Sequence, residues 1–167
     1  MMLAVFDIIL RYLHIIFSVL WIGHNYANLV QNPTFIALHS ETSDEDRDLG
    51  LTRRMQREHG AFRYASLVVL ISGLAMLWYR GTLVAALSLD GHQAVIGIGV
   101  WLGIIMVGNL WFVLWPHQKK VLGFVDAPLD ERIRCSRITF LSSRSNTILS
   151  IPLVFFMVAG SHGLVLL

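Results

Sequence analysis

Hydrophobic residues along this chain gather into four long runs that polar segments separate. The runs cover about residues 8–30, 62–80, 93–115 and 147–166. A helix needs about 20 apolar residues to cross the ~30 Å hydrocarbon core of a bilayer, and each run is close to that length or above it. The pattern therefore predicts an all-α integral membrane protein. We expect a four-helix bundle with up-down topology, in which residues 1–167 form a single membrane domain.

Composition supports this interpretation. Of the 167 residues, 55% are hydrophobic and 14% are charged, whereas soluble domains have roughly 25% charged residues. The mean hydropathy is +0.62. The first run carries Asp7 and Arg11 near its start and has no small-residue cleavage site, so we expect it to be a span and not a cleavable signal peptide.

The distribution of basic residues predicts the orientation. Two groups lie between spans one and two and between spans three and four: Arg47, Arg53, Arg54 and Arg57, and then Lys119, Lys120, Arg132, Arg134 and Arg137. The other side has only Arg11 and Arg80. By the positive-inside rule both long segments are cytoplasmic and both termini are not. We expect a multi-pass protein of a bacterial inner membrane, and we read the net charge of +2 as a topology signal and not as a sign of nucleic-acid binding.

Several classes of site have no signature in the sequence. The single Cys135 allows no disulfide within the chain, and there is no C-x-x-C-H motif for covalent haem attachment. No H-E-x-x-H motif, glycine-rich phosphate loop or nucleophile with a partnered base is present.

The histidines sort into two layers when they are placed by depth along the predicted spans. The outer layer contains His14, His92 and His162; the cytoplasmic layer contains His24, His59 and His117; His39 lies apart in a connecting segment. His14 and His24 are separated by roughly 15 Å along the helix axis and by about 80° around it. Beside them lie Ser18, Trp21, Asn25 and Asn28, which make one polar stripe on an otherwise apolar helix. Such a stripe must face protein, a cavity or a cofactor.

Imidazole groups inside a helical bundle suit haem iron, copper or zinc. A closed copper or zinc site would usually add Cys, Met or carboxylate ligands at close spacing, and the acidic residues here lie almost entirely in connecting segments. Haem needs only one or two axial imidazoles and small residues that make room for the macrocycle, for which Gly97, Gly99, Gly103 and Ser18 are candidates. The sequence thus favours b-type haem. Packing is the other interpretation of Gly99-x-x-x-Gly103.

We assign His14 as the first axial ligand, with His162 as the preferred partner and His92 as the second choice. An axial bond is only ~2.0–2.1 Å long, so one haem cannot use both layers. His24 with His59, and with His117 as a further candidate, would form a second haem site, which predicts two haems per chain. The alternative is that these histidines are hydrogen-bonding or capping residues. Arg63 is expected to anchor span two at the interface, or to meet a haem propionate.

Two segments carry a resemblance to a known family. "WLGIIMVGNLWFVLWPHQKKV" (101–121) and "SRSNTILSIPLVFFMVAGSH" (143–162) resemble the end of the membrane domain of cytochrome c-fused urate hydroxylases, the urate oxidase N-terminal family. The matching positions are Gly103, Met106, Asn109, Phe112, Val113, Pro116, Gln118, Lys120, Asn146, Leu149, Pro152 and His162. "LRYLHIIFSVLWIG" (10–23) is similar to the first helix of that family, and span two matches more loosely through Phe62, Ser72 and Gly73.

The chain also departs from the family pattern. It is far shorter than the fused enzymes and has no cytochrome c domain. Gly97 and Ser145 stand where the family tends to carry His, whereas His24 and His117 replace smaller or amide residues. The resemblance therefore does not carry urate chemistry over. A weaker similarity of span one to HemJ-type protoporphyrinogen oxidases and copper-resistance membrane proteins supports His14 as a haem or metal ligand.

The sequence thus predicts a membrane b-type haem protein that transfers electrons, with one or two haems. It would act as a subunit of, or partner to, a larger redox enzyme such as a cytochrome c or quinone-linked enzyme, in contact with membrane lipid and in a homo- or hetero-oligomer. One alternative is a haem-free structural or assembly subunit of a membrane complex. The third is a stand-alone oxidase that acts on a porphyrin or purine.

Overall fold

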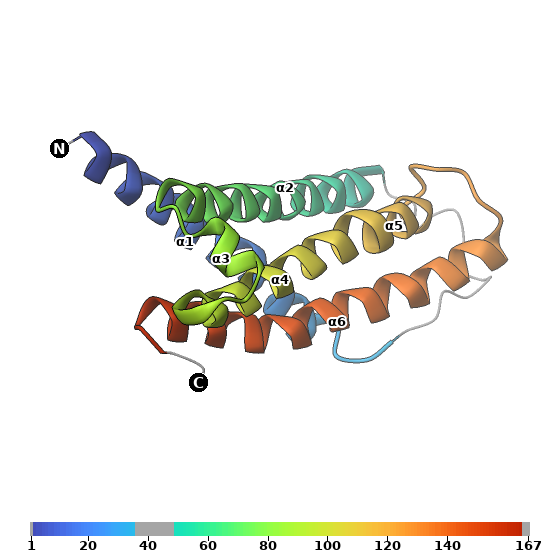
Figure 1. Ribbon diagram of the computed structural model, residues 1–167. Coiled ribbons are helices and arrows are strands. Elements are labelled where there is room, and N and C mark those ends of the chain that lie inside the picture. The colour runs from blue at the N-terminus through green and yellow to red at the C-terminus, as the bar shows by residue number, and fades with distance from the viewer. Residues whose placement is uncertain (1, 36–48, 165–167) are drawn as a thin grey trace.

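The computed structural model describes residues 2–35 and 49–164, with side chains for residues 5–35 and 60–164. Within these ranges all regular secondary structure is helical (Figure 1). The elements are α1 (Met2–Gln31), α2 (Leu49–Tyr79), α3 (Leu83–Leu87), η2 (Gly91–Gln93), α4 (Ala94–Gly108), η3 (Asn109–Leu114), α5 (Trp115–Val121) and α6 (Leu129–Ser161). His39 lies outside the described residues.

Four helical segments in the described part of the chain are long and apolar enough to cross a membrane. They are Val5–Gln31, Gly60–Tyr79, Gly91–Val121 and Leu129–Ser161. Each contains most of one predicted run, so the prediction of four apolar helices is confirmed. The third segment combines η2, α4, η3 and α5 into one almost straight path (Figure 1).

The helices that contain spans two and four are longer than the predicted apolar runs. α6 begins at Leu129, directly after Pro128, so it includes a polar stretch that precedes the apolar run from residue 147. Asp130 and Glu131 lie in its first turn, where negative charge favours the helix dipole. The polar residues up to Ser145 are therefore helical, and α2 likewise begins at Leu49, well before its apolar part. Hydropathy finds the lipid-compatible part of a helix and misses its polar extension.

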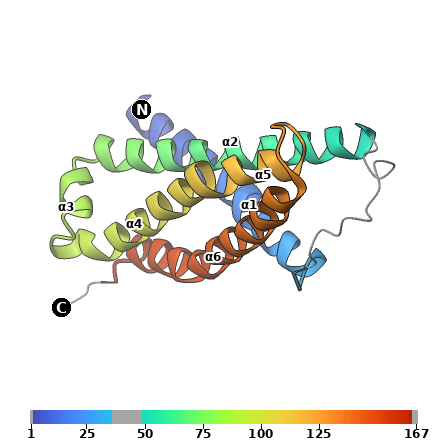
Figure 2. The ribbon, with the colours of Figure 1, turned by 90° about the vertical axis from the view of Figure 1, so that its right-hand side faces the viewer.

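The helices run alternately in opposite directions, so both chain ends lie at the end of the bundle that carries α3 (Figures 1 and 2). The α5–α6 connection and the start of α2 lie at the opposite end. α1 packs chiefly on α2, and α4 packs chiefly on α6. The up-down topology across a membrane and the membrane side of each end stay predictions.

Small residues let α4 and α6 approach closely. A Cβ atom added at Gly160 of α6 would lie 3.0 Å from the backbone nitrogen of Ile96, and one at Gly99 would lie 3.2 Å from Cε of Met157. One at Gly103 would lie 3.6 Å from Cδ1 of Leu153. The packing interpretation of Gly99-x-x-x-Gly103 is therefore confirmed.

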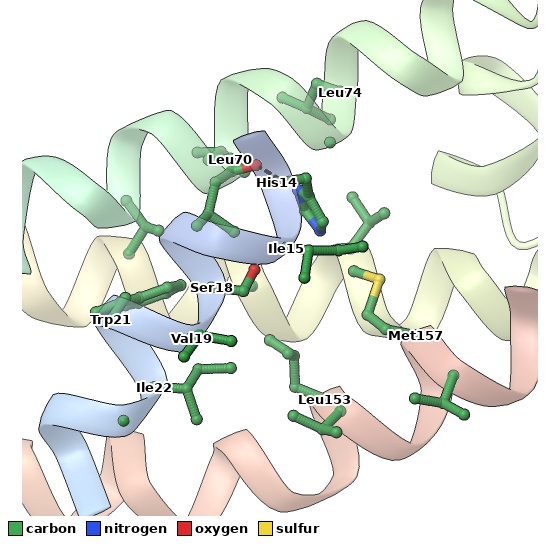
Figure 3. Close-up of a pocket in the computed structure, with 18 of the residues that line it drawn as sticks. His14, Ile15, Ser18, Val19, Trp21, Ile22, Leu70, Leu74, Leu153 and Met157 are labelled. Carbon is green, nitrogen blue, oxygen red and sulfur yellow. Dashed lines mark hydrogen bonds between the residues drawn. The ribbon is translucent and has the colours of Figure 1, made fainter. Parts of the chain in front are cut away.

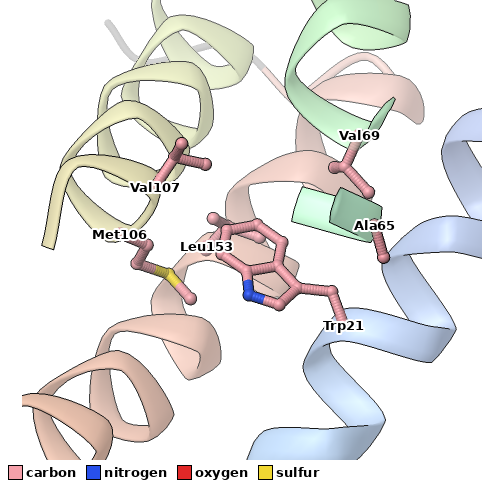
Figure 4. Packing of buried hydrophobic residues seen from close by; sticks show 6 residues of the cluster. All are labelled: Trp21, Ala65, Val69, Met106, Val107 and Leu153. Carbon is pink, nitrogen blue, oxygen red and sulfur yellow. The ribbon is translucent and has the colours of Figure 1, made fainter. Parts of the chain in front are cut away.

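Trp21 has the largest side chain among the buried residues of one hydrophobic cluster and is only 3% exposed. Around it pack residues from the other three long segments, namely Ala65, Val69, Met106, Val107 and Leu153 (Figure 4). Through the indole ring of Trp21, α1 thus packs against all three of the other long segments. Most of its other large apolar residues, such as Ile8 and Val19, are exposed, as expected for a helix in contact with lipid or with another protein.

A buried network of amide and hydroxyl groups joins the third segment to α6. The side-chain amide of Asn109 donates to the backbone oxygen of Ser142 (2.9 Å) and to Oδ1 of Asn146 (2.8 Å). Ser142 donates to Oδ1 of Asn109 (2.8 Å), and Asn146 donates to the backbone oxygen of Met106 (3.2 Å). Asn109 also begins η3, a π-helical turn in which the regular backbone ladder is interrupted.

Candidate functional site: two cavities on either side of Trp21

Between α1, α2, α4 and α6 lies a cavity of about 470 Å³, which we call the apolar cavity (Figure 3). Most of its lining is aliphatic, and the few polar groups come from α1. The lining includes His14, Ser18, Trp21, Tyr26, Val69, Leu70, Gly73, Leu74, Val100, Gly103, Val107, Leu153, Val154 and Met157. Its size falls in the range of roughly 300–1,000 Å³ typical of sites for small molecules and cofactors.

His14 is held in this cavity by the backbone of α2. Its Nδ1 lies 3.0 Å from the backbone oxygen of Val69 and 3.3 Å from Oγ of Ser72. A carbonyl oxygen can only accept a hydrogen bond, so Nδ1 carries the hydrogen in the neutral ring and Nε2 keeps its lone pair. No described residue hydrogen-bonds to Nε2. A ring fixed through one nitrogen, with the other available, is the usual arrangement of a metal-binding histidine.

The close approach of His14 to α2 depends on Gly73. A Cβ atom added at Gly73 would lie 2.9 Å from Cε1 and 3.2 Å from Nδ1 of His14. Figure 3 shows the ring between α1 and α2, with Leu153 and Met157 of α6 on the other side of the cavity. Gly73 thus leaves the space that the His14 ring occupies, which no sequence pattern indicated.

The other histidines predicted for the outer layer do not line this cavity. His92 is exposed in η2, and His162 is exposed just after α6, where its Nδ1 donates to the backbone oxygen of Val158 (2.8 Å). The lining does contain the thioether of Met157. The assignment of His162 or His92 as partner of His14 stays a prediction.

Two of the glycines proposed to make room for a macrocycle serve another purpose. Gly97 faces α3: a Cβ atom there would lie 2.0 Å from the backbone oxygen of Ala86. Gly99 contacts Met157, and neither glycine lines the apolar cavity, whereas Gly103 and Ser18 do. The resemblance placed a family histidine at position 97, and α3 leaves no room for any side chain there.

A second cavity, of about 410 Å³, lies on the other side of Trp21, toward the α5 end of the bundle; we call it the polar cavity. Trp21 lines both cavities. Amides, hydroxyls, aromatic rings and one arginine contribute to the lining, which includes His24, Asn25, Asn28, Asn32, Phe35, Phe62, Arg63, Trp115, Gln118, Ser136, Thr139, Phe140, Ser143 and Asn146. The predicted polar stripe of α1 therefore faces two cavities.

The histidines predicted for the cytoplasmic layer have different surroundings. His24 lines the polar cavity and stacks on Phe62, with ring centroids 3.8 Å apart and an interplanar angle of 12°. His117 does not line it, and its Nδ1 donates to the backbone oxygen of Val113 (2.6 Å). The side chain of His59 lies outside the described residues. A second haem between His24 and His59 therefore stays a prediction.

Arg63 is the residue whose surroundings differ most from the sequence-based expectation. Its guanidinium carbon lies 3.5 Å from the centroid of the Trp115 ring and 5.2 Å from that of Trp111. The side chain is half-buried and lines the polar cavity. Its predicted role as an anchor of span two at the membrane interface stays a prediction. A sequence signal existed in Asn25 and Asn28 of the polar stripe of α1, but nothing local pointed to the arginine of another helix.

Comparison with known protein families agrees with the architecture. The family model described as urate oxidase N-terminal matches residues 48–166, from the start of α2 to beyond the end of α6. The chain belongs to the urate oxidase N-terminal family. No curated protein and no solved structure matches the chain significantly. The family match does not include α1, so His14, His24 and the resemblance of the first helix rest on the sequence motif alone.

The structure also explains several of the residues that carried the family resemblance. Asn109 and Asn146 join the third segment to α6, and Met106 accepts a hydrogen bond from the same network. Ser145, which replaces a family histidine, is exposed and donates to the backbone oxygen of Leu141. In this member of the family, the motif common to spans three and four contributes to helix packing.

Proposed function

We propose that this chain is a membrane b-type haem protein that transfers electrons, as a subunit of or partner to a larger redox enzyme. The observation that carries the proposal is His14, whose Nδ1 is held by the backbone oxygen of Val69 while Nε2 has no partner among the described residues. The ring lines an apolar cavity of about 470 Å³ within a bundle of membrane-like helices. Membership of a family described as urate oxidase N-terminal fits a redox role.

The donor set fits haem better than a closed zinc or copper site. Among the described residues, no three His, Cys, Asp or Glu side chains come together in a way that could hold a metal ion. Structural zinc needs four protein ligands, whereas haem iron needs one or two axial ligands because the macrocycle supplies the other four. A bound b-type haem would supply one-electron transfer; His14 would hold it, and the aliphatic lining of the cavity would exclude water.

Two kinds of residue are candidates that would hold the haem together with His14. His162 and His92 follow from the predicted layers, and Met157 is the donor that lines the same cavity as His14. Imidazole and thioether ligands both occur opposite a histidine in cytochromes. Because a thioether ligand raises the reduction potential, the variants Met157→Leu and His162→Ala distinguish the two assignments by the potential and the spectrum.

The direct test is the visible spectrum and haem content of the purified full chain and of His14→Ala. We expect b-type bands in the wild type, and loss of haem or a changed spin state in the variant, because the axial imidazole is removed. His39→Ala is the matched control, since it also removes one imidazole, at a position in a predicted connecting segment that belongs to neither histidine layer. Full haem content and an unchanged spectrum in His14→Ala would refute the assignment.

The competing function is a haem-free structural or assembly subunit of a membrane complex. The hydrogen bond between His14 and Val69 favours it, because a histidine can join two helices in this way without a metal. A native preparation with no Soret band after haem has been supplied during expression would support this alternative. A stand-alone oxidase acting on a porphyrin or purine would show the haem bands together with turnover of the substrate.

A further inference from the structure

The polar cavity contains hydrogen-bond donors that the described part of the chain leaves unused. Nδ2 of Asn25 is buried without a hydrogen-bond partner there, and so are Nε and Nη1 of Arg63. Asn25 as a whole is only 8% exposed. A buried donor without a partner costs roughly 1–3 kcal/mol, and more when it is charged, so three of them in one cavity indicate an occupant that accepts hydrogen bonds.

The charge of the lining indicates the sign of that occupant. Among the described residues that line the polar cavity, the basic ones are Arg63 and His24, and none is Asp or Glu. Trp115 covers one face of the Arg63 guanidinium, with its ring centroid 3.5 Å from the guanidinium carbon. A half-buried cation without a carboxylate partner among the described residues is best matched by an anion with one negative charge.

The aromatic residues of the lining indicate the shape of the uncharged part of the ligand. The rings of Trp21, Phe35, Phe62, Trp115 and Phe140 surround a volume of about 410 Å³, which suits a small ligand with a flat, unsaturated body. The amides of Asn28 and Asn32 add neutral polar groups. Arg144 is a second cation beside this cavity: it donates to the backbone oxygen of Asn32, and its guanidinium carbon lies 4.7 Å from the centroid of the Phe140 ring. It does not line the cavity, so the lining itself supplies one guanidinium, which a single carboxylate matches.

We propose that the polar cavity binds a small aromatic or unsaturated carboxylate, with the carboxylate on Arg63 and Asn25 and the flat body among the aromatic rings. The proposal does not depend on haem in the apolar cavity. Because Trp21 lines both cavities, the two occupants would be separated by its indole ring. The proposed ligand is a separate molecule and not a haem propionate, since Arg63 and Asn25 line the polar cavity alone and His14 lines the apolar cavity alone.

Benzoate is the probe, titrated calorimetrically into the full chain in detergent, with benzyl alcohol as the neutral analogue. We expect saturable binding of benzoate and none of benzyl alcohol. Arg63→Gln should weaken binding by about tenfold or more, because a charge-assisted hydrogen bond is lost. Arg137→Gln is the matched control: it removes the same charge from an exposed position on α6, between the lining residues Ser136 and Thr139, and should leave binding unchanged.

Asn25→Asp is the second variant, because it keeps the size of the side chain and adds a negative charge to the lining. It should abolish benzoate binding while the protein elutes and melts like the wild type. The proposal is overturned if benzoate does not bind the wild type, or if it binds Arg63→Gln and Asn25→Asp as it binds the wild type. Binding of inorganic phosphate in place of benzoate would overturn the carboxylate assignment in favour of a phosphate or lipid headgroup. A second haem in the wild type that is lost in His24→Ala would also overturn it.

Discussion

The position of the His14 ring depends on residue 73 being glycine, because a Cβ atom at that position would meet the ring. His14 can donate to the backbone of α2 only because Gly73 presents no side chain, and the three nearest atoms to a Cβ atom there all belong to the His14 ring. Gly73 of α2 therefore allows the His14 ring to be held through Nδ1 while Nε2 has no partner among the described residues. This gives the proposed haem site a positioning residue that does not itself contact iron.

Gly73→Ala should displace the His14 ring, because the new Cβ would lie 2.9 Å from Cε1. The bond to the Val69 oxygen would lengthen, and the imidazole would lose its fixed orientation. We expect reduced haem retention and a shifted spectrum in the purified variant, measured as the haem-to-protein ratio and the position of the reduced bands. Gly60→Ala on the same helix is the control, since its Cβ meets no atom within 4 Å. Equal haem binding by both variants would argue against the role of Gly73.

At the scale of elements, α3 and α4 are in contact at Gly97, where the backbone carbonyl of Ala86 occupies the space that a side chain would need. The 2.0 Å separation between the Ala86 oxygen and an added Cβ at Gly97 leaves no room for rearrangement within the two helices. Ala86 is fully buried and packs in a cluster with Leu77 and Val100. α3 therefore closes one end of the bundle over the start of the third segment.

Gly97→Ala should force α3 away from α4 and lower the free energy of unfolding by about 3 kcal/mol or more, at the upper end of the usual cost of overpacking. Gly108→Ala lies in the same helix and meets no atom within 4 Å. It should be neutral, or stabilising by up to about 1 kcal/mol, because alanine is the better helix former. Denaturation in detergent, followed by circular dichroism, compares the two. If Gly97→Ala is as stable as the wild type, the close approach of α3 is wrong.

The amide network between the third segment and α6 gives a second prediction for elements. Asn146→Leu should lower the free energy of unfolding by about 1–3 kcal/mol, since it removes the acceptor of one Asn109 amide bond and the donor to Met106 from a buried position. Ser145→Ala, one residue earlier and exposed, should change it by less than about 0.5 kcal/mol. Similar stability of the two variants would show that the network is not important for helix packing.

At the scale of the whole molecule, the buried Trp21 divides the interior into two cavities of different chemistry. The apolar cavity has one imidazole with a free nitrogen, and the polar cavity has a guanidinium with unused donors. One molecule thus offers a site suited to a hydrophobic cofactor and another suited to an anion. α1 contributes to both, although it packs mainly on α2.

The number of haems per chain distinguishes one haem site with one anion site from two haem sites. The histidine layers predict two haems per fully loaded chain, falling to one in His24→Ala, whereas an anion in the polar cavity predicts one haem that His24→Ala leaves unchanged. A pyridine haemochrome assay against quantitative amino-acid analysis measures the ratio. A ratio of two that falls to one in His24→Ala would confirm the second haem site and refute the anion site.

The sequence by itself determined which segments are apolar helices, because the preference of a residue for lipid or water is a local property that a run of about 20 residues reports directly. It also determined the family, and it placed His14 and the polar stripe of α1 toward the interior, since uncompensated polar groups do not face lipid. Only the tertiary structure decided what the stripe meets. Three contacts join different helices: His14 with Gly73, Arg63 with Trp115, and Gly97 with Ala86. Such contacts depend on how helices rotate and cross, and no local pattern along one helix records that geometry.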